Sequence, residues 1–129
     1  MHKREAQFQT NILNHFIRRH FKKTIVFETK VSATSAFQFG KIEKQQIMWL
    51  NAVKQGGALY KISDQSQGYK PFDGAFWYKV PAYLVIRFPS KHFYFLDIDD
   101  ILFEIKRGKK GITEERSKEI SVISDADFK

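Results

Sequence analysis

The sequence predicts an α/β (α+β) domain in which helices flank one mixed central sheet. Two amphipathic helical patterns enclose a first apolar strand, and a series of short apolar runs follows the second helix. This order is typical of a sheet that contains both parallel and antiparallel pairs. We expect one domain over residues 1–105 and a basic, flexible tail with a short helix over residues 106–129.

The predicted helices follow apolar residues spaced three and four apart. Residues 5–21 form the first, which ends in cations that suit the helix dipole. Residues 41–55 form the second, and Gly56-Gly57 ends it. The cluster Asp97-x-Asp99-Asp100 predicts a strand end and helix cap, with a cation site as the alternative. A last helix is expected from Thr113, which two acidic residues follow.

The predicted strands are short runs of apolar and aromatic residues bounded by turn-forming residues. The first of them covers residues 24–31. Four more are expected at residues 58–62, 72–79, 83–88 and 93–98.

The net charge of +8 comes entirely from the first half of the chain. Residues 1–63 hold 11 Lys and Arg against 3 Glu, whereas the charges of residues 64–129 cancel. This asymmetry predicts a polyanionic partner, with nucleic acid favoured over a membrane surface. A basic protein without such a partner is the alternative.

Neither cysteine chemistry nor a membrane anchor is expected. The chain has no cysteine, which excludes disulfides and thiolate metal sites. No apolar run approaches the ~20 residues that span a bilayer, and no apolar signal segment follows the basic N-terminus. We therefore expect an intracellular, cytoplasmic protein with no membrane partner.

The tripeptide Glu28-Thr29-Lys30 lies within the first predicted strand. Because side chains alternate along a strand, Glu28 and Lys30 point to one face, and Phe27 and Val31 point to the other. A carboxylate beside an ammonium group is the minimum for metal-assisted phosphodiester cleavage. The carboxylate binds a hard divalent cation, and the lysine positions or activates water. The alternative is a solvated Glu/Lys pair on an ordinary strand.

Three further polar residues stand out in the predicted helices and strands. Glu5 continues the apolar stripe of the first helix, either as a carboxylate favoured by the helix dipole or as part of a polar site. Gln46 lies on the apolar stripe of the second helix, either as a satisfied glutamine or as an active-site amide. Asp73 begins a predicted strand before Gly74, which permits close backbone approach, and is either a turn residue or a metal ligand.

With these residues in place, the chain resembles the PD-(D/E)XK nuclease superfamily, and within it the Holliday-junction resolvases of bacteria and phages. The resemblance covers most of residues 5–105. It rests on Glu5, the strand Phe27-Glu28-Thr29-Lys30, the helix with Gln46 and Trp49-Leu50, and the run Tyr94-Phe95-Leu96-Asp97. It implies a restriction-endonuclease-like core, a Mg²⁺ or Mn²⁺ cofactor, DNA as the partner, a homodimer and either a bacterial or a phage source. It also implies catalytic roles for Glu5, Glu28, Lys30 and Gln46.

One residue of the superfamily pattern is missing from its usual place. Members carry a metal-binding Asp on the strand before Glu-x-Lys, whereas this chain has no aspartate before Asp64. The superfamily relocates motif residues in sequence while it keeps them together in space. The resemblance therefore implies Asp73, Glu28 and the carbonyl of Thr29 as metal ligands. If Asp73 does not fold back beside Glu28, the alternative is a nucleic-acid-binding module that keeps the fold but does not cut.

The function predicted from these residues is metal-dependent hydrolysis of phosphodiester bonds in DNA, structure-specific and resolvase-like. Lys30 would orient or deprotonate the attacking water, and Gln46 would orient Lys30 or the phosphate. Basic side chains would contact backbone phosphates, which give affinity without sequence preference. These are Arg18, Arg19, Lys22, Lys23, Lys41, Lys44 and Lys70.

Overall fold

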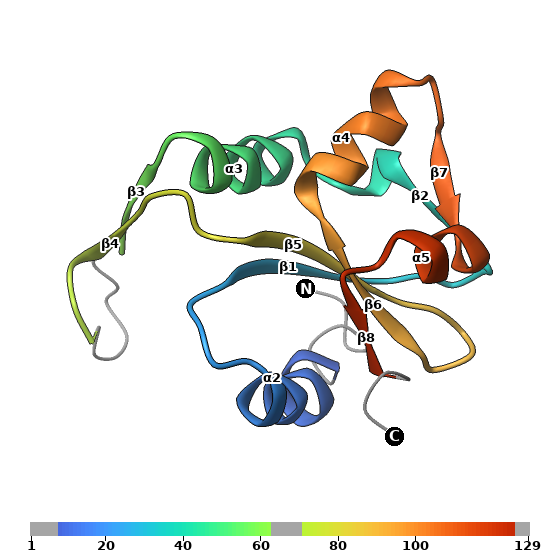
Figure 1. Ribbon diagram of the computed structural model, residues 1–129, viewed down its shortest axis with the longest axis horizontal. Coiled ribbons are helices and arrows are strands. Elements are labelled where there is room, and N and C mark those ends of the chain that lie inside the picture. The colour runs from blue at the N-terminus through green and yellow to red at the C-terminus, as the bar shows by residue number, and fades with distance from the viewer. Residues whose placement is uncertain (1–7, 63–70, 126–129) are drawn as a thin grey trace.

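A mixed four-stranded sheet forms the centre of the fold (Figure 1). The computed structural model describes residues 8–62 and 71–125. The strand order is β1 (Val26–Val31), β5 (Ala82–Arg87), β6 (Phe93–Asp97) and β8 (Ile123–Ser124). β1 and β5 are parallel, whereas β6 is antiparallel to both β5 and β8. The predicted α/β class with a mixed sheet is confirmed.

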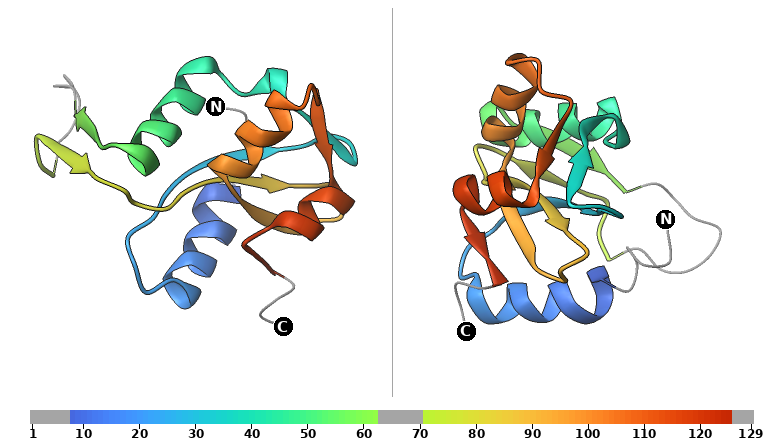
Figure 2. Two further views of the ribbon diagram at one scale, coloured as in Figure 1. Left: turned by 45° about the horizontal axis from the view of Figure 1, so that its top comes forward. Right: turned by 90° about the vertical axis from the view of Figure 1, so that its right-hand side faces the viewer.

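Helices cover both faces of this sheet (Figure 1, Figure 2). On one face lies α2 (Asn14–His20), which continues from the π-helical segment η1 (Phe8–Leu13). On the other lie α3 (Lys44–Gln55) and α4 (Ile98–Lys106). A last helix, α5 (Glu114–Ile120), packs against β6, and Thr113 caps it as predicted. In the described part of the chain, no helix has the length and apolar character to cross a membrane.

Two antiparallel ribbons complete the fold. β2 (Ala36–Gln38) pairs with β7 (Gly111–Thr113), and the 3₁₀ turn η2 (Phe39–Lys41) follows β2. β3 (Ala58–Lys61) pairs with β4 (Gly74–Trp77), and this β3–β4 ribbon projects beyond one end of α3 (Figure 1). The three-residue strands β2 and β7 were not predicted, because so short a run carries no clear alternation.

The core consists of two layers, one on each face of the sheet. Along β5, Leu84 and Ile86 join the layer beneath α3 and α4, whereas Tyr83 and Val85 join the layer above α2. The alternation of the strand explains this division. Both faces of the sheet are therefore apolar, and any polar side chain on β1 lies next to a hydrophobic layer.

Residues 106–125, expected as a basic and flexible tail, instead contribute packed elements. β8 is hydrogen-bonded to β6 within the main sheet, and β7 is hydrogen-bonded to β2. Ile112 is buried in the core, and Ile120 packs against it. The many charged residues around these isoleucines suggested a flexible tail. The apolar side chains of the isoleucines nevertheless hold the segment against the core. The boundary expected at residue 105 falls within α4.

Candidate active site

β1 presents Glu28 and Lys30 on the face of the sheet that α3 covers. Val26 packs in the layer beneath α3, whereas Phe27 and Val31 pack on the side of α2. Alternation therefore places Glu28 and Lys30 on the same face as Val26. The Lys30 Nζ lies 3.8 Å from Glu28 Oε1, and the two side chains are 14 % and 30 % exposed. The pair is largely shielded from water, unlike a solvated Glu/Lys pair on a surface strand.

A hollow of about 260 Å³ lies between β1 and the first turns of α3. We call it the β1–α3 hollow. Its lining includes Val26, Glu28, Glu43, Gln46, Trp49 and Leu50. The packing of α3 on β1 thus brings Glu28 and Gln46 to one cavity, although they lie on different elements.

Gln46 is also part of the N-terminal cap of α3. Its side-chain oxygen accepts a hydrogen bond from the Glu43 backbone N–H at 3.1 Å, and the Glu43 carboxylate accepts one from the Gln46 backbone N–H. This reciprocal pair is a capping box. Because Oε1 faces the helix end, Nε2 is the end of the amide that can donate to an acceptor in the hollow.

Glu43, which was not among the predicted site residues, supplies a second carboxylate to the lining of the hollow. The signal was present in the sequence. Glu43 and Gln46 have the spacing of a capping box, with the cap residue three positions before its glutamine. This spacing also places both side chains on the first turn of α3, which faces β1.

The backbone of Thr29 turns away from β5. The Val26 N–H donates to the carbonyl of Pro81 at 2.9 Å, so the even-numbered residues of β1 form the ladder with β5. The odd-numbered residues direct their N–H and C=O groups to the opposite edge, where no strand of the described structure pairs with β1. The Thr29 carbonyl therefore lies at the open edge next to Glu28. A carboxylate and a carbonyl oxygen are ligand types that suit Mg²⁺.

Asp73 does not line the β1–α3 hollow. It is exposed just before β4, and its carbonyl accepts a hydrogen bond from the Ile62 N–H at 2.7 Å. A Cβ on the neighbouring Gly74 would lie 2.5 Å from the carbonyl oxygen of Tyr60, so the expected close backbone approach at Gly74 is confirmed. Asp73 thus belongs to the projecting ribbon, whereas Glu28 belongs to the main sheet.

An aromatic row runs from the hollow to this ribbon. The ring of Trp49, which lines the hollow, lies 6.1 Å from that of Tyr60, and Tyr60 lies 6.2 Å from Trp77. Within residues 8–62 and 71–125, no group of three or more His, Cys, Asp and Glu side chains could hold a metal ion. Glu5 and Lys70 lie outside the described residues.

The acidic cluster at the start of α4 is occupied by structural contacts. The Asp97 carboxylate caps the helix by accepting a hydrogen bond from the Asp99 N–H, and it also accepts one from Lys54 Nζ at 2.6 Å. Burial opposes the charge of Lys54, but the hydrogen bonds that its ammonium group donates to Asp97 and Asp99 outweigh this effect and raise the pKa of Lys54 above its usual value. The predicted helix cap is confirmed, and Lys54 supplies the positive charge that a cation would bring.

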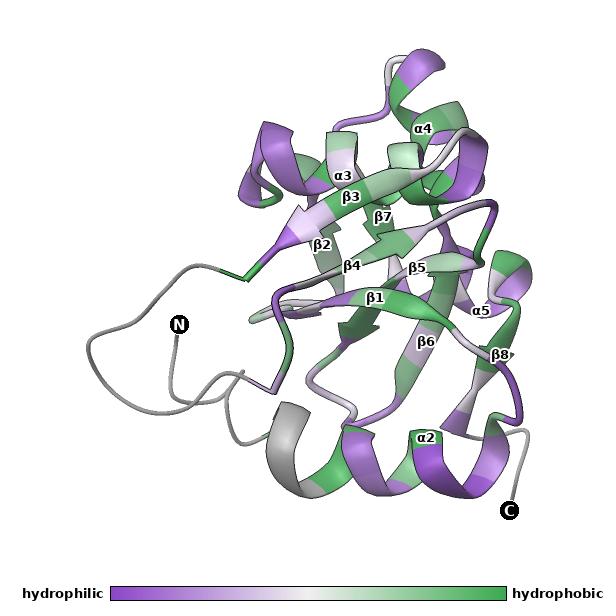
Figure 3. Ribbon diagram, turned by 90° about the vertical axis from the view of Figure 1, so that its left-hand side faces the viewer, coloured by the Kyte–Doolittle hydropathy of each residue, from purple (hydrophilic) through white to green (hydrophobic). Residues whose placement is uncertain are grey.

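The basic residues expected to contact DNA fall into two groups. Arg18, Arg19, Lys22 and Lys23 lie on or just after α2, whereas Lys41 and Lys44 lie just before and at the start of α3. All six are exposed. Because α2 and α3 cover opposite faces of the sheet (Figure 3), the two groups lie on different sides of the protein.

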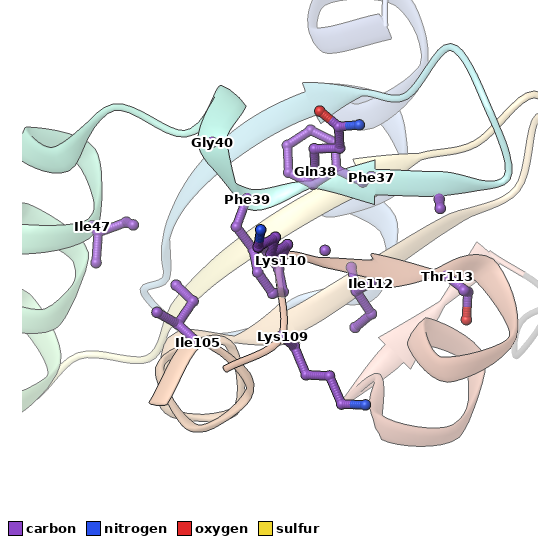
Figure 4. A pocket seen from close by; sticks show the side chains of 12 residues that line it. Phe37, Gln38, Phe39, Gly40, Ile47, Ile105, Lys109, Lys110, Ile112 and Thr113 are labelled. Atoms are coloured by element: carbon purple, nitrogen blue, oxygen red, sulfur yellow. The ribbon is translucent and has the colours of Figure 1, made fainter. Parts of the chain in front are cut away.

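A larger hollow, of about 800 Å³, lies between the β2–β7 ribbon and the ends of α3 and α4. Ile47, Ile105 and Phe39 converge there, while Lys109 extends away from them (Figure 4). No carboxylate lines this hollow. It therefore lacks the chemistry for cation-assisted hydrolysis, and the smaller β1–α3 hollow is the better candidate.

Comparisons with known proteins identify no relative. No protein-family model matches the chain, and no significant match was found among curated proteins or among solved structures. The resemblance to PD-(D/E)XK nucleases therefore stays a prediction from the residues that carry it.

Proposed function

We propose that this protein is a metal-dependent endonuclease that hydrolyses phosphodiester bonds in branched DNA. The observation that supports this best is the β1–α3 hollow. It places a shielded carboxylate, Glu28, beside the ammonium group of Lys30 and near the amide of Gln46. Glu28 and Gln46 line the hollow, and Lys30 lies next to Glu28. A carboxylate, a hydrogen-bond donor and a neighbouring cation suit a reaction that moves negative charge onto phosphate oxygens.

In this proposal, Glu28 and the Thr29 carbonyl hold Mg²⁺ or Mn²⁺ at the open edge of β1. The cation, when bound, lowers the pKa of its water and neutralises charge on the scissile phosphate. Lys30 orients the attacking water or stabilises the charge on the phosphate. The Nε2 group of Gln46 donates a hydrogen bond to a phosphate oxygen, and the capping box keeps that group in place.

A further carboxylate ligand is needed to balance the charge of the cation, and two residues compete for this role. Asp73 is the relocated aspartate that the family resemblance implies, and it reaches the site only if the β3–β4 ribbon closes toward β1. Glu43 already lines the hollow but accepts a hydrogen bond at the start of α3. Asp73→Asn and Glu43→Ser separate the two, because serine preserves the helix cap while it removes the carboxylate.

We further propose that two copies of the chain act together. Paired cuts on opposite strands of a junction need two active sites, one for each strand. The exposed cations of α2 and α3 would contact phosphates on different arms of the DNA, because they lie on opposite faces of the sheet.

Cleavage of a labelled four-way junction by the full chain tests the proposal. A duplex of the same sequence is tested in parallel, and both substrates are incubated with Mg²⁺, with Mn²⁺ and with EDTA. We expect cutting of the junction only with metal, and its loss in Glu28→Gln while binding in EDTA persists. Glu115→Gln, which changes an exposed glutamate of α5, is the matched control and should cut normally.

A non-catalytic DNA-binding module is the second candidate, and the exposed position of Asp73 outside the hollow favours it. It predicts salt-sensitive DNA binding by a wild-type protein that is inert on every DNA structure with either metal. That result would exclude the endonuclease.

A further inference from the structure

Exposed apolar side chains concentrate on and beside the β3–β4 ribbon. Ten large apolar side chains of the described structure are exposed, and seven of these belong to the ribbon, to its flanking residues or to the adjoining face of α3. The seven are Met48, Trp49, Leu59, Tyr60, Phe72, Phe76 and Tyr78. A soluble protein rarely leaves so many together without a binding role.

The two faces of this ribbon differ. Tyr60 and Trp77 lie on the inner face, where the Tyr60 ring also contacts Trp49 of α3. Leu59 and Phe76 are directly opposite each other on the outer face, and they are 70 % and 65 % exposed. Packing within the chain therefore explains the aromatic residues of the inner face, whereas the apolar side chains of the outer face stay exposed to solvent.

The outer face is also basic. By the register of the ribbon, Lys61 follows Leu59 on this face. Just after β4, the Tyr78 ring lies close to the Phe76 ring, because both would meet a Cβ placed on Gly57, at 3.3 and 3.0 Å. Next to it, the Nζ of Lys79 lies 5.4 Å from the centre of the Tyr78 ring. No carboxylate occupies this face in the described part of the ribbon, so the surface combines planar rings with positive charge only.

We propose that the outer face of the β3–β4 ribbon binds unpaired nucleotides, with bases stacked on Phe76 and Tyr78 and phosphates near Lys61 and Lys79. Rings interleaved with cations are the usual platform for single-stranded nucleic acid. Bases within a duplex are already stacked, so an exposed ring has a free partner only where pairing is interrupted. The inference rests on the proposed function in one respect, that the partner is branched DNA.

Charge disfavours a second copy of the chain as the occupant. Two outer faces that met across a two-fold axis would place the Lys61 and Lys79 side chains of both copies together. Like charges that face each other in an interface repel and disfavour association. A polyanion instead neutralises these cations while its bases cover the rings.

Fluorescence anisotropy with labelled oligo(dT) tests the inference, in EDTA so that binding is measured without cutting. Because stacking on one aromatic ring contributes about tenfold in affinity, Phe76→Ala should weaken binding about tenfold. Phe76→Leu should be equally weak and Phe76→Trp close to wild type, because stacking needs a ring and not merely apolar bulk. Phe103→Ala, which truncates an exposed phenylalanine on α4, is the matched control and should bind normally.

Several outcomes would overturn the platform. The platform is wrong if the wild-type protein does not bind oligo(dT), if Phe76→Ala binds it as tightly as wild type, or if Phe76→Leu keeps the full affinity. A change from dimer to monomer in Phe76→Ala, seen by sedimentation, would assign the face to a second copy. Junction cleavage measured in parallel keeps the two proposals apart. If the wild-type protein does not cut the junction but Phe76→Ala weakens oligo(dT) binding, the binding platform stands and the nuclease proposal fails. If the wild-type protein cuts the junction but Phe76→Ala does not change oligo(dT) binding, the nuclease proposal stands and the platform fails.

Discussion

The Nζ of Lys30 lies 3.8 Å from Oε1 of Glu28, on the strand at the edge of the main sheet. This distance allows strong electrostatic attraction but exceeds that of a direct hydrogen bond. The ammonium group therefore keeps donors that it can offer to a ligand bound next to Glu28. Because the pair is partly shielded, a change in either charge is felt by the other group.

Removing the Lys30 charge should stop cleavage without preventing DNA binding. We expect Lys30→Met to lower the single-turnover cleavage rate about 10²-fold or more, as for loss of a group that orients or deprotonates water. The methionine keeps the apolar stem of the side chain, so the fold should be preserved. Lys44→Met on α3 is the control, since its exposed lysine is proposed to contact phosphates only. Equal effects of the two changes on rate and affinity would contradict the role of Lys30.

Two substitutions of Gln46 should separate its effect on stability from its effect on cleavage. Gln46→Ala removes the acceptor for the Glu43 N–H and should lower the free energy of unfolding by about 0.5–1 kcal/mol. Gln46→Glu keeps the capping box and should leave stability nearly unchanged. It should still slow cleavage about tenfold or more, because a carboxylate cannot donate to a phosphate. Urea unfolding and cleavage assays on the same preparations measure both. Normal cleavage by Gln46→Glu would show that the residue only caps the helix.

The Thr29 side chain and backbone should be separable in the same way. Thr29 is 1 % exposed, and its Oγ1 has no hydrogen-bond partner in the described structure. An unsatisfied buried hydroxyl costs about 1–3 kcal/mol, so the isosteric Thr29→Val should be neutral or stabilising in urea unfolding. Cleavage should not change, since the proposed ligand is the carbonyl. A loss of metal-dependent activity in stably folded Thr29→Val would instead assign the hydroxyl to the site.

Asp100 should make the protein less stable as pH rises above the acid range. Burial, and next the charge of Asp97, raise the pKa of the Asp100 carboxyl above its usual value. The folded protein therefore holds this proton more tightly than the unfolded chain, and the free energy of unfolding falls as pH rises from the usual value of 3.8 through the raised value. Asp100→Asn has no such proton to lose. Its stability relative to wild type should increase across this range in urea unfolding at successive pH values, and a constant difference would refute the shift.

Much of the fold follows from short-range patterns in the sequence. The strands β1, β5 and β6 were expected within two residues at each end, because alternation and aromatic content are strong there. The capping of α4 and α5 by Asp97 and Thr113 was also readable from local spacing. What local spacing does not specify is which strands pair. The parallel pairing of β1 with β5 depends on packing between distant segments.

The same distinction applies to the candidate site. Glu28, Lys30 and Gln46 could be chosen because each polar side chain interrupts an apolar pattern, and Glu28 and Gln46 line one hollow. Asp73 was chosen for its position at a predicted strand start before Gly74, and because the resemblance implies a relocated metal ligand. Its position relative to Glu28 depends on how the β3–β4 ribbon projects from α3, and no pattern in the sequence encodes that direction.

The parallel pairing of β1 with β5 also sets a time order for the nascent chain. The ribosome makes Glu28 and Lys30 before β5, so β1 gains its hydrogen-bonded neighbour only after α3 and the β3–β4 ribbon have been translated. Because contacts between distant segments form late, the strand that carries the candidate catalytic residues stays unpaired until β5 has emerged. The sheet that holds Glu28 and Lys30 would therefore form only after β5 has been made.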